Sequence, residues 1–238
     1  NSLQLNIRRV RRVQEIEYNV ADYMPASIYS VGTMYKELTD FIGSIKNTYL
    51  KTLAESYFVK DKAFIENFVK HSAAKSVHHG FMGGLLEHTL GVMKLCDFYC
   101  TRYEILNRDL LMTAALFHDI GKTKELSLFP ANDYTDEGQL IGHIVIGVEM
   151  IHDRVREIPG FPEILENELK HCIVAHHGEF EYGSPKKPAL IEAMALNLAD
   201  NTDAKMQTMT ELFRGTPDNL EWLGFNRFLD SNIRKTSK

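Results

Sequence analysis

Residues 111–122 read LMTAALFHDIGK, an apolar run that closes on an imidazole and a carboxylate, His118 and Asp119. Gly121 then supplies a turn, and Lys122 adds a nearby cation. Burying either ionisable group without a partner costs several kcal/mol, so an apolar segment gains nothing by ending this way. A metal ion would remove that cost, because neutral imidazole nitrogens and carboxylate oxygens are ligands for divalent metals. The run therefore predicts a metal site at the end of a buried helix, with further ligands elsewhere in the chain.

Around this run, apolar residues recur at helical spacing from about residue 30 onwards. Prolines and glycines separate the helical stretches, and the sequence contains no internal repeat. The pattern predicts an all-α fold in the form of a helical bundle. The predicted helices span residues 31–56, 62–70, 84–104, 107–119, 138–157, 161–176, 188–207 and 218–229.

The first residues of the chain follow a different pattern. Residues 3–13 read LQLNIRRVRRV, which alternates polar and apolar positions and predicts a β-strand. A lone strand is not stable in water, and the sequence offers no partner downstream, so we expect it to be the end of an upstream domain. Residues 19–27 read as a linker. We therefore divide the chain into residues 1–27, a remnant strand with its linker, and residues 28–238, a helical domain.

Composition narrows the functional classes. The 238 residues are 44% hydrophobic and 25% charged, as in an ordinary globular protein, and no apolar run is long enough to span a bilayer. The net charge of −5 gives no global reason to expect nucleic-acid binding, so any basic surface must be local. Three cysteines, an odd number, argue against a disulfide framework. We expect a cytoplasmic protein without a membrane partner.

Further residues of metal-ligand type lie in apolar surroundings on separate predicted helices. Each one alone is more often a hydrogen-bonded core residue, but helices that converge in a bundle core are a usual way to build a metal site. Nitrogen together with carboxylate ligation suits Mn, Fe, Co, Ni or Zn better than Ca or a site for Mg alone. With the first pair, the candidate ligands are His88, His118, Asp119, His143, His176, His177 and Asp200.

The order His, His-Asp, His, His, Asp resembles that of the HD-domain metal-dependent phosphohydrolases, over roughly residues 70–210. The resemblance implies two divalent transition-metal ions, manganese first among the metals named above. One ion would be held by His88, His118, Asp119 and Asp200. Asp119 would bridge to the second, held also by His143 and His176. For His177, the resemblance leaves open whether it binds metal itself or contacts one of the metal-binding residues.

Two longer segments resemble the YhaM-type 3′-5′ exoribonucleases. They are residues 75–89, KSVHHGFMGGLLEHT, and residues 176–188, HHGEFEYGSPKKP, followed by Glu192-Ala193 and by DNTDAK at residues 200–205. In that family an OB-fold nucleic-acid-binding domain precedes the HD domain, so the strand at residues 3–13 would be the last of the OB-fold. The resemblance implies a metal-dependent phosphodiesterase that shortens RNA from its 3′ end, with single-stranded RNA or a nucleotide as substrate. The sequence does not give the oligomeric state and leaves a homo-oligomer open.

Residues near the expected site have two interpretations each. Asp119 and Lys122 are the candidate catalytic residues: the first as the bridge between metals, the second as a contact to a phosphate oxygen or, alternatively, a solvated lysine. Phe180 and Tyr182 would stack on a base or, as we expect, pack in the core. Contacts to substrate or to the metal ligands are predicted for His79 and the preceding His78, and for His177, Lys186 and Asp203, with plain structural roles as the alternative.

Two other functions remain open. A nucleotide phosphohydrolase or a cyclic-dinucleotide phosphodiesterase would use the same fold, although the Gly-Tyr-Pro signature of the latter enzymes is replaced here by EYGSP at residues 181–185. A catalytically silent module that only binds RNA or nucleotide is the third possibility. The complete ligand set argues against it, because a silent domain has no reason to keep every buried ligand.

Overall fold

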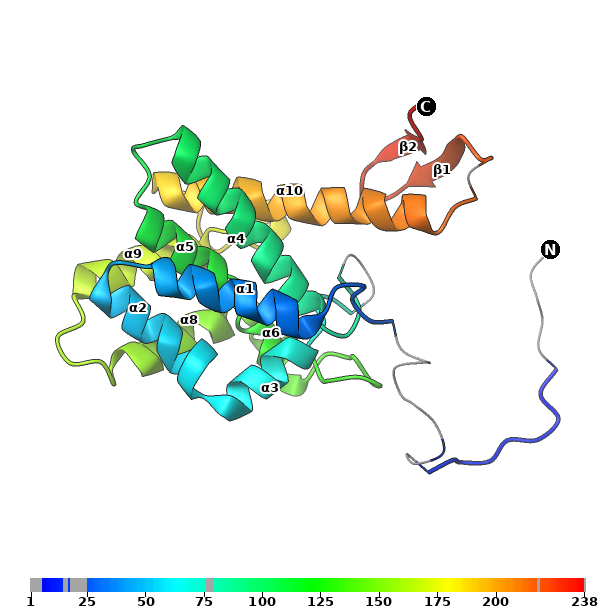
Figure 1. Cartoon of the computed structure of the whole chain (residues 1–238), viewed down its shortest axis with the longest axis horizontal. Coiled ribbons are helices and arrows are strands. Elements are labelled where there is room, and N and C mark those ends of the chain that lie inside the picture. Colours follow the sequence, from blue (N-terminus) through cyan, green and yellow to red (C-terminus); the bar gives the residue numbers. More distant parts are fainter. Residues whose placement is uncertain (1–5, 15–16, 18–24, 76–78, 218, 238) are drawn as a thin grey trace.

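The computed structural model describes residues 6–14, 17, 25–75, 79–217 and 219–237. In this part of the chain a bundle of helices carries one small two-stranded sheet, which confirms the all-α prediction (Figure 1). The helices are α1 (Val31–Ser44), α2 (Thr48–Glu55), α3 (Lys62–Lys70), α4 (Gly84–Arg102), α5 (Arg108–Phe117), α6 (Lys122–Glu125), α7 (Asp136–Leu140), α8 (His143–Val155), α9 (Glu163–Val174) and α10 (Ile191–Arg214); the strands are β1 (Trp222–Asn226) and β2 (Ser231–Arg234).

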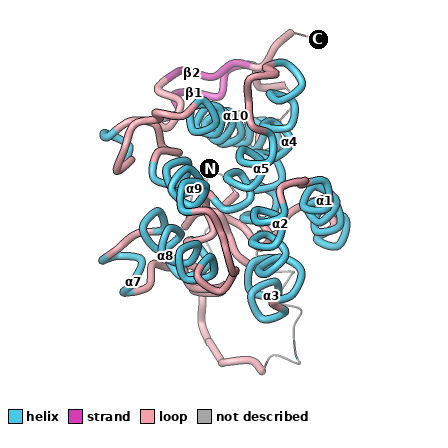
Figure 2. Tube along the Cα trace, turned by 90° about the vertical axis from the view of Figure 1, so that its left-hand side faces the viewer, coloured by secondary structure: helices cyan, strands magenta, loops and turns pink. Residues whose placement is uncertain are grey.

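Helix α5 lies at the centre of the bundle. Every residue from Leu110 to Phe117 is buried, and the helix packs against α2, α4, α9 and α10 (Figure 2). A fully buried Leu or Phe side chain contributes about 1.5–3 kcal/mol relative to an exposed one, so this short helix is strongly held. The turn that follows it, from His118 to Gly121, is therefore fixed in the interior of the protein.

The single helix predicted for residues 31–56 is two helices, α1 and α2. The break lies at Asn47, whose side-chain oxygen accepts hydrogen bonds from the backbone N–H groups of Tyr49 (3.0 Å) and Leu50 (3.1 Å). Asparagine is among the best residues for capping a helix start. The Asp109 carboxylate in turn accepts a hydrogen bond from the Asn47 backbone N–H (2.7 Å), which ties this break to the start of α5.

The stretch predicted as one helix over residues 138–157 is also divided. Helix α7 ends at Leu140, and Gly142 adopts a positive φ of 79° that interrupts the helical path before α8 begins. Glycine adopts such a conformation without steric cost. His143 is consequently the first residue of α8, at an end of the helix and not inside it.

The helix predicted for residues 218–229 is wrong for the described part of that range, which contains strand β1 and the start of the turn that leads to its antiparallel partner β2. Gly224 has a positive φ of 85° and Asp230 a positive φ of 47°, both outside the helical region. The Asn226 side chain accepts a hydrogen bond from the Leu229 backbone N–H (3.0 Å) and so stabilises the turn. Turn-forming residues thus outweigh the helical spacing of the apolar ones.

The β-strand predicted for residues 3–13 is wrong for the described part of that range, residues 6–13. Residues 6–14 form no strand, and the apolar side chains of Ile7 and Val10 are 74% and 84% exposed. A strand needs a hydrogen-bonding partner, and none of the described residues supplies one here. Residues 3–5 and the linker residues 19–24 lie outside the described part of the chain, and the assignment of residues 1–27 to an OB-fold remnant stays a prediction.

Candidate metal centre

The structure brings all six predicted metal ligands together around the Asp119 carboxylate. The other five come from different elements. His88 lies on α4, His143 at the start of α8 and Asp200 on α10. His118 comes directly after α5, and His176 comes two residues after the end of α9. The side chains of His88, His118, Asp119 and His176 are almost completely buried, at 0–3% exposed. Histidine and aspartate at such burial are found where they have charged or metal partners.

One oxygen of Asp119, Oδ2, faces the first group of side chains. Its distance to the Nε2 atoms of both His88 and His118 is 3.4 Å. The two imidazoles approach each other with Nε2 atoms 3.1 Å apart, and the Oδ1 atom of Asp200 lies 3.2 Å from the His88 Nε2. Two nitrogens and two carboxylates therefore converge on this side of Asp119.

The other oxygen of Asp119, Oδ1, faces the second group. It lies 3.5 Å from the Nε2 atom of His143 and 3.8 Å from that of His176. All three atoms are buried, and none of them has a hydrogen-bond partner among the described residues. Buried polar atoms are nearly always satisfied, so three such atoms facing one another fit a bound cation.

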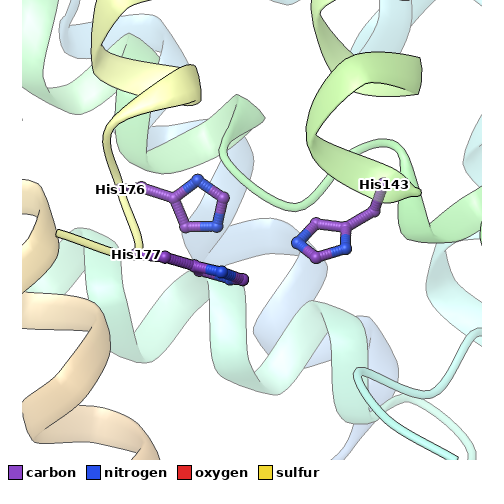
Figure 3. Close-up of side chains that lie close together, drawn as sticks. All are labelled: His143, His176 and His177. Atoms are coloured by element: carbon purple, nitrogen blue, oxygen red, sulfur yellow. The ribbon is translucent and has the colours of Figure 1, made fainter. Parts of the chain in front are cut away.

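His177 joins this second group. Figure 3 shows the rings of His143, His176 and His177 turned toward one another from the start of α8 and from the segment after α9. A ligand atom from each of the three histidines lies within 4.8 Å of those of the other two. The ring centroids of His176 and His177 are 4.3 Å apart. The geometry therefore allows His177 to bind metal, the question that the sequence left open.

In every histidine of the two groups, the second ring nitrogen is held by a neighbouring acceptor. Metal-binding histidines usually donate their other ring N–H to a carboxylate or a backbone carbonyl, which fixes the tautomer and leaves a lone pair for the metal. The Nδ1 contacts are His88 with Asp203 Oδ2 (2.7 Å), His118 with the Ala115 carbonyl (2.8 Å), His143 with Glu125 Oε1 (3.0 Å), His176 with the Ile173 carbonyl (2.6 Å) and His177 with the Tyr182 carbonyl (2.8 Å).

Glu125 is a residue that the sequence interpretation missed. It is buried at the end of the short helix α6, and its Oε1 atom accepts hydrogen bonds from both the ring and the backbone N–H of His143, each 3.0 Å long. Burial raises the pKa of this carboxyl, but the contacts to His143 outweigh burial and lower it. Glu125 fixes the ring orientation of His143. An acid after two lysines carries no signal of this in the sequence.

Asp203 and His79 lie behind His88, away from the open side of the centre. Asp203 Oδ2 contacts His88 Nδ1 and also lies 2.9 Å from His79 Nε2. His79 is only 2% exposed. This position favours orientation of His88 over contact with substrate for both residues. His78 lies outside the described residues.

The two groups differ in charge. Burial lowers the pKa of His88, but the neighbouring carboxylates, first that of Asp119, outweigh burial and hold its pKa well above the usual range. In the second group, burial and the neighbouring His177 hold the pKa of His176 well below its usual value. A neutral His176, with its Nδ1–H donated to a carbonyl, has the Nε2 lone pair that metal binding requires.

Of the two lysines predicted for the site, the structure places Lys122 at the metal centre and Lys186 away from it. Lys122 is at the centre, and its Nζ donates a hydrogen bond to Asp119 Oδ2 (2.6 Å). Burial lowers the pKa of Lys122, but Asp119 outweighs burial and raises it, so the lysine is charged. Lys186 has an exposed side chain that does not line the cleft at the centre. The structure therefore does not bring Lys186 to the predicted site.

An open cleft of about 770 Å³ leads from the centre to solvent. Phe180 and Tyr182 were expected in the core, but they are 62% and 70% exposed, and Tyr182 lines this cleft. Two further contributors, Lys205 and the hairpin turn after β1, were missed by the sequence interpretation. The lining residues are His88, Asp119, Lys122, His177, Gly178, Glu179, Tyr182, Asn197, Asp200, Asn201, Ala204, Lys205, Arg227, Phe228, Leu229 and Asp230.

Gly121 sets how closely α8 approaches the turn after α5. A Cβ atom on this glycine would lie 2.0 Å from the His143 carbonyl oxygen and 2.8 Å from the Gly147 backbone nitrogen. Both neighbours are backbone atoms, so no side-chain rotation could relieve the clash. Only glycine allows His143 to come within reach of Asp119.

None of the helices in the described part of the chain combines the length and the apolar character that a membrane span requires. The three cysteines, Cys96, Cys100 and Cys172, are unpaired thiols.

Comparison with known proteins identifies a family whose matched region contains these residues. A family model of the HD domain matches residues 85–205, a range that includes all six predicted ligands. The 3′-5′ exoribonuclease YhaM of Bacillus subtilis strain 168 is 36% identical over 208 residues, which is 87% of this chain and 65% of that protein. YhaM of Listeria innocua is 33% identical over 216 residues, 90% of this chain and 67% of that protein.

The chain thus spans about two thirds of the length of the curated relatives that it matches. No solved structure matches it. The HD-domain match and the identity to several YhaM proteins over most of the chain point to one family. This chain belongs to the HD-domain family and, within it, to the YhaM type.

Proposed function

We propose that this chain is a divalent-metal-dependent phosphodiesterase that shortens RNA from its 3′ end. One observation supports the phosphodiesterase chemistry most directly. The two oxygens of the Asp119 carboxylate face two different groups of histidines. The RNA substrate and the 3′-5′ direction are taken from the printed names of the relatives.

The proposed ligands form two sets that share Asp119. The first set is His88, His118, Asp200 and Asp119 Oδ2; the second is His143, His176 and Asp119 Oδ1, with His177 as a further nitrogen. Two divalent ions about 3.5–4 Å apart would supply an activated water and stabilise the charge on the leaving oxygen of a phosphodiester. The mixed nitrogen and carboxylate donors support a transition metal, for which we propose manganese.

The chain's own residues hold this arrangement before substrate arrives. The acceptors at the Nδ1 atoms keep each imidazole in one tautomer and one orientation, so little reorganisation is needed during the reaction. Lys122 neutralises part of the charge of Asp119, and its position in the cleft supports a contact to a phosphate oxygen once the carboxylate is shared with metal. A cytoplasmic location and homo-oligomers stay predictions.

The test uses the wild-type chain loaded with Mn²⁺ and an oligoribonucleotide labelled at its 5′ end. We expect a ladder of progressively shorter labelled products that disappears in excess EDTA, and two metal ions per chain by elemental analysis. Immediate release of the labelled 5′ nucleotide would contradict the direction. Hydrolysis of mononucleotides or cyclic dinucleotides alone would favour the other enzymes of this fold, and RNA binding without cleavage would favour the silent module.

The same oligonucleotide made of DNA is the matched control for substrate class. Faster shortening of RNA than of DNA is the expected result. Equal rates would contradict RNA as the preferred substrate while leaving the metal-dependent phosphodiesterase intact.

A further inference from the structure

The hairpin at the end of α10 places a defined turn beside the metal centre. Asn226 pairs with Ser231 across the strands, and residues 227–230 form the turn between them. The base of the hairpin is fastened to the segment after α10, because Lys235 Nζ donates hydrogen bonds to the Thr216 and Pro217 carbonyls, each 3.1 Å long. The hairpin thus lies beside the C-terminal part of α10, with its base held by these two hydrogen bonds (Figure 1).

All four residues of this turn line the cleft that also contains His88, Asp119 and Lys122. The hairpin comes from the last part of the described chain, whereas those three side chains come from α4 and from the segment around α6. The fold therefore closes one wall of the cleft with an element that supplies none of the proposed metal ligands. A wall of this kind can contact the parts of a substrate that lie outside the reacting phosphate.

Two cations of the cleft have no acidic partner among the described residues, Arg227 in the turn and Lys205 on α10. By contrast, Lys122 is paired with Asp119, and Lys187, which does not line the cleft, is paired with Glu179. The cleft also contains the carboxylates of Asp230 and Glu179, so its walls are mixed in charge. Cations exposed in a cleft without a paired acid are suited to bind the phosphates of a nucleic-acid strand.

The turn also presents an aromatic side chain to the cleft. Phe228 lines it and is 46% exposed, and Tyr182, 70% exposed, lines it as well. Two aromatic rings that line the same cleft are therefore accessible to a ligand in it. Proteins that bind single strands combine cations along the backbone with aromatic rings on which bases stack.

We propose that the hairpin turn is the RNA-binding wall of the active cleft. Arg227 and Lys205 contact backbone phosphates upstream of the reacting one, and Phe228 stacks on a base of the same strand. This inference rests on the proposed function and extends it, since it assigns substrate binding to residues outside the metal centre.

The experiment compares steady-state kinetics of Mn²⁺-loaded variants on an oligoribonucleotide and on a small phosphodiester, bis(p-nitrophenyl) phosphate. Arg227→Gln, Lys205→Gln and Phe228→Ala should each raise KM for RNA about tenfold, the scale of one lost backbone or stacking contact. Their loss on the small ester should be several times smaller, because that ester has no upstream phosphates or bases. Phe228→Tyr, which keeps a ring, should retain the KM of the wild type.

The hairpin itself offers matched controls. Arg234 and Phe225 are exposed on the same hairpin but do not line the cleft, so Arg234→Gln and Phe225→Ala should leave KM for RNA within about twofold of the wild type. The salt dependence gives a second measure. Each cation removed should reduce the slope of log KM against log salt concentration by about 0.7, the value for one phosphate contact on a single strand.

The outcomes separate the two proposals. If the wild type shortens RNA but the three cleft variants behave like the two controls, this inference is overturned and the proposed function stands. If the wild type neither shortens nor binds RNA, the proposed function fails and this inference fails with it. Equal losses on RNA and on the small ester would also overturn it, because they would indicate general damage to the centre.

Discussion

The two sides of Asp119 are built from the same residue types but in different proportions. The Oδ2 side combines His88 and His118 with a second carboxylate, Asp200, and with Lys122. On the Oδ1 side, the described residues that face Asp119 are imidazoles, and the nearby carboxylate of Glu125 contacts the far nitrogen, Nδ1, of His143. Three of the buried atoms on this side, Asp119 Oδ1, His143 Nε2 and His176 Nε2, have no hydrogen-bond partner among the described residues.

For the proposed two-metal centre, this difference predicts two sites of unequal strength that share one carboxylate. An unsatisfied buried polar atom costs about 1–3 kcal/mol, so the Oδ1 side gains stability when a cation binds there. The Oδ2 side supplies a second carboxylate ligand, Asp200, and a charged ligand strengthens the attraction for a divalent ion even though Lys122 offsets part of the charge on this side. We therefore expect stepwise binding, with the first Mn²⁺ on the Oδ2 side and the second, weaker one on the Oδ1 side, as two phases in a calorimetric titration.

The largest effect is expected for Asp119→Ala, which removes the residue shared by both sides. Both metals of the proposed centre should be lost, and RNA hydrolysis should fall by a factor of roughly 10³ or more, because the proposed two-metal activation would be abolished. Metal analysis and the 5′-labelled RNA assay measure the two losses. A variant that keeps two metals and normal turnover would show that Asp119 is not the bridge.

The next largest loss of turnover is expected for His88→Ala and for His143→Ala, each of which removes a proposed ligand from one side of Asp119 only. Each should lower turnover by roughly 10²-fold, since one of two metals is impaired. In the titration, His88→Ala should remove the tight phase and His143→Ala the weak phase. If both variants lost the same phase, the division into two sides would be wrong.

A smaller effect is expected for the partners behind the ligands, Asp203 and Glu125. Replacing such a partner typically lowers metal affinity by about 10–100-fold. Asp203→Asn should weaken the first binding phase through His88, and Glu125→Gln the second phase through His143. The exposed pair of Lys36 and Asp40, far from the centre in sequence, supplies the control Asp40→Asn, for which both phases should be unchanged.

The smallest effect concerns stability. Mn²⁺ at ten times the dissociation constant of a site should stabilise the folded chain by about 1.4 kcal/mol, which corresponds to a rise in Tm of roughly 3–6 °C. Differential scanning fluorimetry measures this rise. The Asp119→Ala variant should show no rise, and an equal rise in that variant would place the binding elsewhere.

Sequence patterns predicted the helical core well because it depends on local periodicity and apolar burial. The bounds of α3 agree with the predicted range of residues 62–70, and α4 and α5 differ from prediction by two residues or fewer at each end. Apolar periodicity did not predict the helix bounds that depend on a capping residue or on a turn. Asn47 caps the start of α2 within a stretch expected to be one helix, and Asn226 and Gly224 favour a hairpin where a helix was expected.

The candidate ligands could be named from the sequence because ligand types in apolar helices are unusual and because their order resembles that of a known family. Their roles remain predictions, but the structure brings them together. Glu125 and Arg227 could not be found in this way. Their positions beside His143 and in the cleft depend on how α6 and the hairpin pack, which no local pattern encodes. Lys186 shows the converse, since nearness in sequence to His176 did not bring it to the cleft.

Gly121 sets a limit on how this centre can vary. Because its hydrogen atom faces the His143 carbonyl, the separation between the two halves of the centre depends on the absence of one methyl group. Substitutions elsewhere in the cleft can alter which strand it accepts, whereas an alanine here would act as a spacer between α5 and α8. In the proposed two-metal centre, the distance between the metals would thus be set by the backbone and not by the side chains that are proposed to bind the substrate.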